Sequence, residues 1–432
     1  MLDGGGNMDA LRIQGGKRLK GEWTVQNAKN AALPIMAGAI LTEGKTFLRD
    51  CPQLSDISDM GEILRTLGCG VHRNDGTLEL DPGGLCGYEM PEELSKRIRS
   101  SIFLLGPILA RFRRANVSLP GGCEIGLRPI DLHLSGLRQL GVQMVEEGGV
   151  IRCDGRNMHP ATVHFDYPSV GATENVMMAA ALLRGETVLN NVAREPEILD
   201  LQRFLNAMGA RIAGAGTNTI RVQGVSRLTG VEYRPMPDRI AAGTLLAAAA
   251  VTGGSVRLHN VPVEEMLAVI AKLEEMGCVI SRQQSALTLH GPERLTAFAQ
   301  LQTQPHPGFP TDMQAQMMAA ASLAKGTSVV VENVFENRFA HAGDLNRMGA
   351  NILINGRTAV IRGVERLSGA RVTARDLRGG AALAIAGLAA QGETIVERAR
   401  LIDRGYEHLE TALSHLGADI QRISAEKGEK HP

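Results

Sequence analysis

Residues 65–71 read RTLGCGV, and this pattern of leucine or methionine, then glycine, then a strand-like segment returns five more times. The copies read RQLGVQM (138–144), NAMGARI (206–212), EEMGCVI (274–280), NRMGANI (346–352) and SHLGADI (414–420). Each copy closes an amphipathic segment, where glycine is the residue that most readily ends a helix. Because the copies recur about every 70 residues, the sequence predicts six copies of one structural unit.

The rest of the unit repeats as well. A strand opened by a turn precedes each amphipathic segment, and an alanine-rich segment such as 241–251 precedes that strand. The alanine-rich segments are apolar on nearly all faces, and a helix of that kind must be buried. Each unit is therefore expected to hold one buried helix, one half-exposed helix and short strands, which is an α/β fold.

The final strand of the unit predicts how the chain closes. It reads IRVQGVSRLTG at 220–230 and VIRGVERLSG at 360–369, but the sixth unit ends near residue 423 without it. The missing piece, LRIQGGKRLKG, stands at 11–21. We expect the N-terminal strand to complete the last repeat. Two three-repeat domains follow, residues 22–236 and residues 1–21 with 237–432, joined twice so that a hinged cleft forms between them.

The composition excludes several classes of protein. With 44% hydrophobic and 21% charged residues among 432, the chain is globular and not disordered. Lys and Arg total 46, as do Asp and Glu, and aromatics are 3%, so neither a basic field nor stacking platforms indicate nucleic acid as a partner. The longest apolar stretch is too short for a membrane span. With no secretory leader and no zinc-type pattern, we expect a cytoplasmic protein with reduced thiols, without metal or other cofactor.

Polar and charged residues stand at two repeat-equivalent places. The buried helices begin with Lys29 and Asn30, Arg99, Ser169, Asp312 and Arg378, and the loops after the first strand hold Cys123, Arg128, Arg338 and Arg404. Helix N-termini flanked by Lys or Arg form anion sites. Repeat symmetry places all of these on one side of each domain, with enough charge for a diphosphate and a second small anion. The alternative is that they are helix caps and surface salt bridges.

Cys123 differs from the other cysteines. It lies in the glycine-rich loop PGGCEIG (120–126), shortly before Arg128. A cationic cleft lowers a thiol pKa from its ordinary ~8.5, and such a group acts as acid, base or nucleophile. We therefore expect Cys123 to have a chemical role.

These residues fall in strings that resemble the UDP-N-acetylglucosamine 1-carboxyvinyltransferase family of enolpyruvyl transferases: NAKNAALP, SLPGGCEIGLRPIDLH, PSVGAT, AREPEI, PHPGFPTDMQAQ, FENRF, DLRGGAAL and IDRGYE. The resemblance covers the chain from about Met8 onward. It implies two inside-out α/β barrel domains, each a threefold repeat of a βαβαββ-type unit. The implied reaction is the first committed step of peptidoglycan synthesis, in which the enolpyruvyl group of phosphoenolpyruvate moves to the 3′-hydroxyl of UDP-N-acetylglucosamine and phosphate is released.

The resemblance also implies roles for individual residues. Cys123 handles proton transfer to the phosphoenolpyruvate methylene and is the target of fosfomycin, and Asp312 is the base at the sugar hydroxyl. Lys29 and Arg404 hold phosphoenolpyruvate, with Arg128, Arg338 and Arg378 nearby. The sugar nucleotide is held by Asn30, Arg99, Arg128, Pro129, Ile130, Asp131, Leu132, Ser169, Val170, Gly171 and Val334.

The chain departs from the family pattern in places. Asn27 replaces the glycine of the common GAKN string, and Tyr167-Pro168 stand where some members carry a lysine that contacts the nucleotide diphosphate. Residues 1–7 extend beyond the family start. Two alternatives remain open: a 5-enolpyruvylshikimate-3-phosphate synthase, which shares the fold but lacks the PGGC loop, and an inactive sugar-nucleotide-binding paralogue.

Overall fold

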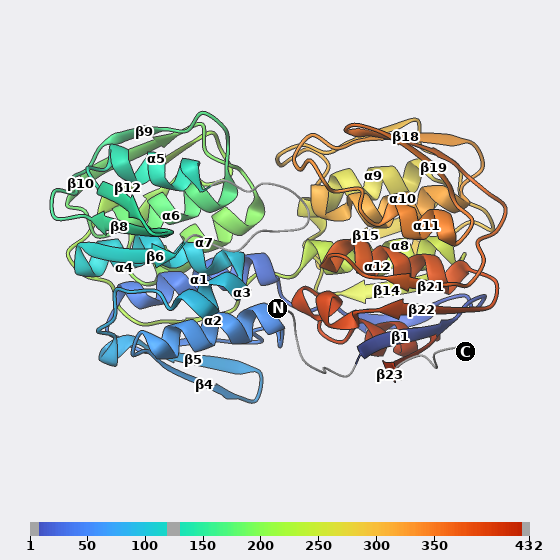
Figure 1. The fold of residues 1–432 in the computed structure, drawn as a ribbon, viewed down its shortest axis with the longest axis horizontal. Helices are drawn as coiled ribbons and strands as arrows, with labels where there is room; N and C mark the ends of the chain where they lie inside the picture. Colours follow the sequence, from blue (N-terminus) through green and yellow to red (C-terminus); the bar gives the residue numbers. More distant parts are fainter. Residues whose placement is uncertain (1–7, 119–129, 426–432) are drawn as a thin grey trace. The chain divides into compact units, whose positions relative to one another are not determined.

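The elements of the chain group into two units. A computed structural model describes residues 8–118 and 130–425 (Figure 1). The central unit comprises the described residues from Asn27 to Met236, and the discontinuous unit comprises those up to Gln26 and from Pro237 onward. Each unit is described by itself below.

The boundary at the first connection lies later than the repeat pattern predicts. Residues 22–26, which we expected in the first domain, belong to the discontinuous unit. The reason is that β2 (Lys20–Thr24) pairs in parallel with β14 (Ser255–His259). No residue of β2 is fully buried. The strand therefore has no apolar pattern from which the sequence could place it in the discontinuous unit.

The described part of the central unit contains three copies of the repeat. Its helices are α1 (Lys29–Gly38), α2 (Ser55–Thr66), α3 (Glu92–Arg97), α4 (Leu105–Phe112), α5 (Asp131–Gln139), α6 (Val170–Ala180), α7 (Pro196–Ala207) and the 3-10 helices η1 (Ala39–Leu41), η2 (Pro82–Gly84) and η3 (Arg99–Leu104). Its sheets have the strand orders β13-β3-β5-β4, β6-β8-β7 and β11-β12-β10-β9. The strands are β3 (Thr46–Leu48), β4 (Gly70–Asn74), β5 (Thr77–Asp81), β6 (Arg114–Ser118), β7 (Gln143–Glu147), β8 (Val150–Asp154), β9 (Thr162–His164), β10 (Gly185–Asn190), β11 (Arg211–Ala213), β12 (Thr219–Gly224) and β13 (Glu232–Tyr233).

The described part of the discontinuous unit repeats the same plan. Its helices are α8 (Arg239–Val251), α9 (Leu267–Glu275), α10 (Gln314–Leu323), α11 (Ala342–Arg347), α12 (Leu377–Ala389), α13 (Leu409–His415), η4 (Val263–Met266), η5 (Thr311–Met313) and η6 (Ala399–Arg404). Its sheets have the orders β15-β16-β14-β2, β17-β18-β20-β19 and β21-β22-β1-β23. Besides β2 and β14, the strands are β1 (Met8–Gln14), β15 (Val279–Gln283), β16 (Ala286–His290), β17 (Gln300–Gln302), β18 (Thr327–Val331), β19 (Asn351–Asn355), β20 (Thr358–Arg362), β21 (Arg371–Thr373), β22 (Glu393–Glu397) and β23 (Asp419–Ala425).

The alanine-rich helices form the interior of each unit. Every residue of α8 from Arg239 to Ala250 is buried, as is every residue of α12 from Arg378 to Leu388. In the discontinuous unit α8, α10 and α12 pack against one another, and in the central unit α4 packs against α6. Strands such as β10 and β18 alternate buried and more exposed residues, so the sheets cover the helices with one face toward solvent. This helices-inside, sheets-outside order is the inside-out α/β arrangement (Figure 1).

Two details of the repeat are as the sequence predicts. Strand β1 lies between β22 and β23 and pairs antiparallel with both, so the N-terminal strand completes the last sheet. The repeat glycines all have positive φ, between 90° at Gly141 and 103° at Gly209, the left-handed conformation that ends a helix.

Within the described residues, no helix has the length and apolar character needed to cross a bilayer.

Candidate active site

A cluster of charged side chains in the discontinuous unit is centred on Asp312. This residue lies in η5, directly before α10. Its Oδ1 accepts a hydrogen bond from Nη2 of Arg338 at 2.7 Å, and its Oδ2 accepts one from Nη2 of Arg378 at 3.0 Å. The two arginine side chains are only 3% and 2% exposed, whereas Asp312 is 25% exposed. Three residues far apart in the sequence are thus brought together around one partly exposed carboxylate.

Both arginines keep donors that the described residues do not satisfy. Nε of Arg338, and Nε and Nη1 of Arg378, are buried and have no hydrogen-bond partner among the described residues. Burial alone would lower the pKa of Arg378, but the influence of Tyr406, Asp312 and Asp238 outweighs it, so the pKa is raised and the group stays charged. An unpaired buried N–H is unfavourable by about 1–3 kcal/mol, and an anionic ligand would satisfy these donors.

Helix α12 places Arg378 through an N-cap. The Oδ1 of Asp376 accepts hydrogen bonds from the backbone N–H groups of Arg378 and Gly379 at 2.9 and 3.0 Å. The guanidinium carbon of Arg378 lies 5.2 Å from the ring centroid of Tyr406. The cap and the ring together fix both ends of this side chain.

Arg404 is the last residue of η6 and is half-buried. The chain after it passes close to α12, because a Cβ on Gly405 would lie 2.5 Å from Cδ1 of Leu377 and 3.3 Å from Nη1 of Arg378. Glycine at 405 therefore lets the segment that carries Arg404 approach the Arg378 side chain.

Val334 lies in a loop organised by Glu332, a residue that the sequence analysis did not single out. Glu332 is 1% exposed, and its Oε1 accepts hydrogen bonds from the backbone N–H of Val334 at 2.8 Å and of Phe335 at 3.1 Å. Its Oε2 accepts a hydrogen bond from the hydroxyl of Thr311 at 2.9 Å. One buried carboxylate thereby holds the Val334 loop and the residue next to Asp312.

In the central unit, Lys29 begins α1 and is buried. Its Nζ donates a hydrogen bond to Oδ2 of Asp56 at 3.1 Å, and both side chains are less than 10% exposed. An ammonium group has three donors, so this pair leaves Lys29 able to bind an anion as well. Asn30 follows it and is half-buried.

The other expected residues of the central unit meet around His133. Ile130 and Leu132 flank the start of α5, and Asp131, the first residue of the helix, is exposed. A Cβ on Gly171 would lie 2.9 Å from Cε1 of His133, so the start of α6, with Ser169 and Val170, lies beside this ring. Nδ1 of His133 is 3.0 Å from Nδ2 of Asn175, which also donates to the carbonyl of Ile102 at 2.7 Å.

The electrostatics of His133 also involve Arg99. Burial, and to a smaller extent the positive charge of Arg99, lowers the pKa of His133 from 6.5 to about 3. The imidazole is therefore neutral, with Nδ1 as acceptor and Nε2 carrying the proton. The sequence signal for this residue was its place in the string RPIDLH, two residues after Asp131.

The pH dependence of stability tests this neutral histidine. Between pH 7 and pH 5 the unfolded imidazole, with pKa 6.5, takes up a proton that the folded one, with pKa about 3, does not. Lower pH therefore favours unfolding, and His133 should contribute a loss of about 2 kcal/mol over this range. In urea unfolding, His133→Gln should lose that much less than the wild type, whereas the exposed His72→Gln should behave as the wild type does. Equal losses for His133→Gln and wild type would contradict the assignment.

The alternative interpretation, that these residues are helix caps or surface salt bridges, holds for Ser169 and fails for Arg338 and Arg378. Ser169 is an N-cap, since its Oγ accepts from the backbone N–H of Ala172 at 3.4 Å. Arg338 and Arg378 are buried and are not surface salt bridges. Cys123, Arg128 and Pro129 lie outside the described residues.

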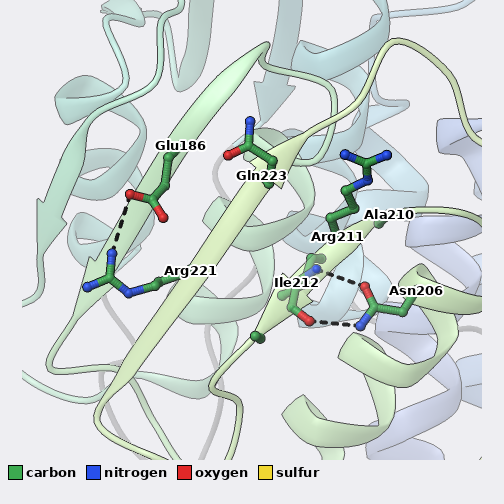
Figure 2. Close-up of a pocket in the computed structure, with 8 residues that line it drawn as sticks. Glu186, Asn206, Ala210, Arg211, Ile212, Arg221 and Gln223 are labelled. Carbon is green, nitrogen blue, oxygen red and sulfur yellow. Dashed lines mark hydrogen bonds and ion pairs between the residues drawn. The ribbon is translucent and has the colours of Figure 1, made fainter.

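Two cavities of the described residues lie away from Asp312 itself. One, of about 360 Å³, lies on the central unit beside Asn206, Arg211 and Arg221, and Figure 2 shows Arg221 paired with Glu186 and the Asn206 amide paired with the backbone of Ile212. A second, of about 270 Å³, lies in the discontinuous unit beside Tyr406 and Glu407. Among the described residues no group of three His, Cys, Asp or Glu side chains could hold a metal ion.

Comparisons with known proteins give one family. The profile described as EPSP synthase (3-phosphoshikimate 1-carboxyvinyltransferase) matches residues 13–413. UDP-N-acetylglucosamine 1-carboxyvinyltransferase 2 of Caldanaerobacter subterraneus subsp. tengcongensis is 51% identical over 416 residues, which are 96% of this chain and 100% of that protein. The UDP-N-acetylglucosamine 1-carboxyvinyltransferase of Myxococcus xanthus is 50% identical over 421 residues, 97% of this chain and 100% of its own.

Solved structures agree on the fold. The enolpyruvyl transferase NikO from Streptomyces tendae has a TM-score of 0.88 at 24% identity, covering 98% of this chain and 100% of its own. EPSP synthase from Acinetobacter baumannii has a TM-score of 0.75 at 18% identity, and the match covers 96% of this chain and 100% of that one. These distant likenesses show the fold alone, whereas the relatives at half identity over the whole length show the family. The chain belongs to the UDP-N-acetylglucosamine 1-carboxyvinyltransferase family of enolpyruvyl transferases.

Proposed function

We propose that the protein transfers the enolpyruvyl group of phosphoenolpyruvate to the 3′-hydroxyl of UDP-N-acetylglucosamine, releasing phosphate, in the first committed step of cytoplasmic peptidoglycan synthesis. The observation that supports this most strongly is that two buried arginines hold the Asp312 carboxylate and keep donors that no described residue satisfies. The arrangement offers a base and an anion site side by side. Transfer from a phosphorylated enol to an alcohol requires that combination.

The proposed chemistry is addition followed by elimination. A proton adds to the methylene carbon of phosphoenolpyruvate, and the adjacent carbon becomes electrophilic. The sugar oxygen bonds to that carbon while the Asp312 carboxylate takes the hydroxyl proton as a general base. Loss of a methyl proton then expels phosphate. Charge-assisted hydrogen bonds from Arg338 and Arg378 stabilise the phosphate as it leaves.

The remaining residues have supporting roles in this proposal. From the family resemblance, Cys123 supplies the methylene proton. Lys29 and Arg404 hold the carboxylate and phosphate of phosphoenolpyruvate. Asn30, Arg99 and Val334, together with residues 128–132 and 169–171, hold the sugar nucleotide. No step needs a metal or organic cofactor.

Phosphate release with different acceptors tests the proposal. We expect release from phosphoenolpyruvate only when UDP-N-acetylglucosamine is present. Release with shikimate 3-phosphate instead would favour the other carboxyvinyltransferase that the family profile names. No release with either acceptor, together with nucleotide binding, would identify an inactive sugar-nucleotide-binding paralogue.

Arg404 should matter more for phosphoenolpyruvate than for the nucleotide. In Arg404→Ala a charge-assisted hydrogen bond of about 1.5–3 kcal/mol is lost, so the KM for phosphoenolpyruvate should rise roughly 10- to 150-fold. The KM for UDP-N-acetylglucosamine should change little, and Arg400→Ala, an exposed residue of the same η6 helix, serves as the control. A larger rise in the KM for UDP-N-acetylglucosamine would show that Arg404 binds the nucleotide and not phosphoenolpyruvate.

A further inference from the structure

The side-chain amide of Gln26 bonds the backbone of Gly405 and Glu407, which are far from it in the sequence. Its Nε2 donates a hydrogen bond to the carbonyl of Gly405 at 3.2 Å, and its Oε1 accepts one from the backbone N–H of Glu407 at 2.7 Å. One side-chain amide thus bridges the backbone on both sides of Tyr406. The segment it bridges is the one that follows Arg404.

Gln26 is itself firmly anchored. It follows β2, which pairs with β14, and the N–H of Val25 donates to the carbonyl of His259 at 2.9 Å. The carbonyl of Gln26 accepts a hydrogen bond from the backbone N–H of Asp238, also at 2.9 Å. Asp238 in turn caps the buried helix α8. The amide therefore ties the Arg404 segment to the rigid frame of the discontinuous unit.

The side chain of Tyr406 explains why the register of this segment matters. Its hydroxyl lies 2.9 Å from Oγ1 of Thr244, and Nε2 of Gln316 donates to it at 3.2 Å. The same Gln316 nitrogen donates to the carbonyl of Asp312 at 2.9 Å. A shift of the segment would disturb Arg404 before it and, through Tyr406, the Asp312 cluster.

The surroundings leave room for such a shift. The cavity of about 270 Å³ is lined by Gln26, Tyr406, Glu407 and His408, among others. A segment packed on all sides needs no tether, because a close-packed interior already fixes it. The segment after Arg404 borders this cavity on one side. There the Gln26 amide supplies the hydrogen bonds to the backbone of Gly405 and Glu407.

We propose that Gln26 is a positioning residue for Arg404. By holding the carbonyl of Gly405 and the N–H of Glu407, it keeps the guanidinium of Arg404 aimed at phosphoenolpyruvate. This role rests on the function proposed above. Gln26 immediately precedes Asn27, the residue that replaces the glycine of the common GAKN string.

Steady-state kinetics of Gln26→Ala test the proposal. We expect the KM for phosphoenolpyruvate to rise about 3- to 10-fold, the effect of losing the net contribution of one or two neutral hydrogen bonds, with the KM for UDP-N-acetylglucosamine unchanged. Gln26→Glu retains the acceptor for Glu407 but lacks the donor for Gly405, so it should show the same direction of change.

Asn206 provides a matched structural control in the central unit. Its amide clamps the backbone of Ile212 in the same way, with bonds of 2.8 and 2.9 Å (Figure 2). Asn206→Ala should lower thermal stability about as much as Gln26→Ala does, and both KM values should stay as in the wild type. Equal KM changes in the two variants would reduce Gln26 to a purely structural residue and overturn the proposal.

A double-mutant cycle ties the effect to Arg404. In the Arg404→Ala background, Gln26→Ala should raise the KM for phosphoenolpyruvate by much less than it does in the wild type, because the group it positions is gone. Additive effects would overturn the proposal while leaving the proposed function intact. A wild-type protein that releases no phosphate with UDP-N-acetylglucosamine would overturn both.

Discussion

Replacing Asp312 with asparagine is expected to lower kcat by about 10²- to 10⁴-fold, the usual contribution of a general base. Asparagine has nearly the same shape and keeps one oxygen as an acceptor, so one of the two arginines retains its hydrogen bond. It cannot take the proton of an attacking hydroxyl. The rate of phosphate release at saturating substrates is the measurement, with thermal unfolding as the check that the fold survives.

Asp344 offers a matched control for this substitution. It is a buried aspartate of the same unit whose oxygens lie 3.7 Å from Nη1 of Arg347 and 3.7 Å from Nε of Arg375. Asp344→Asn should therefore weaken two longer ion pairs with exposed arginines without a large loss of kcat. If Asp312→Asn turned over at the wild-type rate, Asp312 would have no part in the chemistry.

Replacing Arg378 with lysine is expected to lower kcat/KM for phosphoenolpyruvate by about 10²- to 10³-fold. Lysine keeps the positive charge but presents a single nitrogen, and it cannot bond Asp312 and an anion in the forked geometry of a guanidinium. Removing one preorganised donor to developing charge typically has an effect of this size. Kinetics with phosphoenolpyruvate as the varied substrate give the ratio.

Stability separates this effect from damage to the fold. Arg111 is a largely buried arginine of the central unit that donates to the carbonyls of Ile40 and Thr42. Arg111→Lys should lower the melting temperature as Arg378→Lys does, yet leave kcat/KM close to the wild-type value. Loss of activity in both variants to the same degree would attribute the Arg378 result to packing.

The repeat pattern predicted the architecture because it is a local signal. A glycine that ends each amphipathic helix has positive φ in all six copies, and the missing strand of the last repeat is supplied by β1. Repeat equivalence also placed Asp312 and Arg378 at the starts of buried helices. The exception is β2, whose pairing with β14 depends on a distant strand and leaves no apolar mark on its own residues.

The residues that sequence analysis missed owe their importance to hydrogen bonds that form only in the folded chain. Asp56, Glu332 and Gln26 are ordinary polar residues in the sequence, and nothing local distinguishes them from exposed ones. Burial of Glu332, with donors from Thr311 and the Val334 loop, appears only once β18 and η5 are packed together. The bonds of Gln26 span 379 and 381 residues of chain. Hydrogen bonds of this range follow from the fold and not from the pattern that predicts it.

The fate of the bridging oxygen of phosphoenolpyruvate tests the proposed transfer most directly. With oxygen-18 between C2 and phosphorus, and UDP-N-acetylglucosamine as acceptor, addition and elimination break the carbon–oxygen bond. The account predicts that all of the label leaves in inorganic phosphate, visible by phosphorus NMR, while the nucleotide product gains an enolpyruvyl group without label. Label retained in pyruvate, with phosphate free of it, would show that the phosphorus–oxygen bond breaks and would contradict carboxyvinyl transfer.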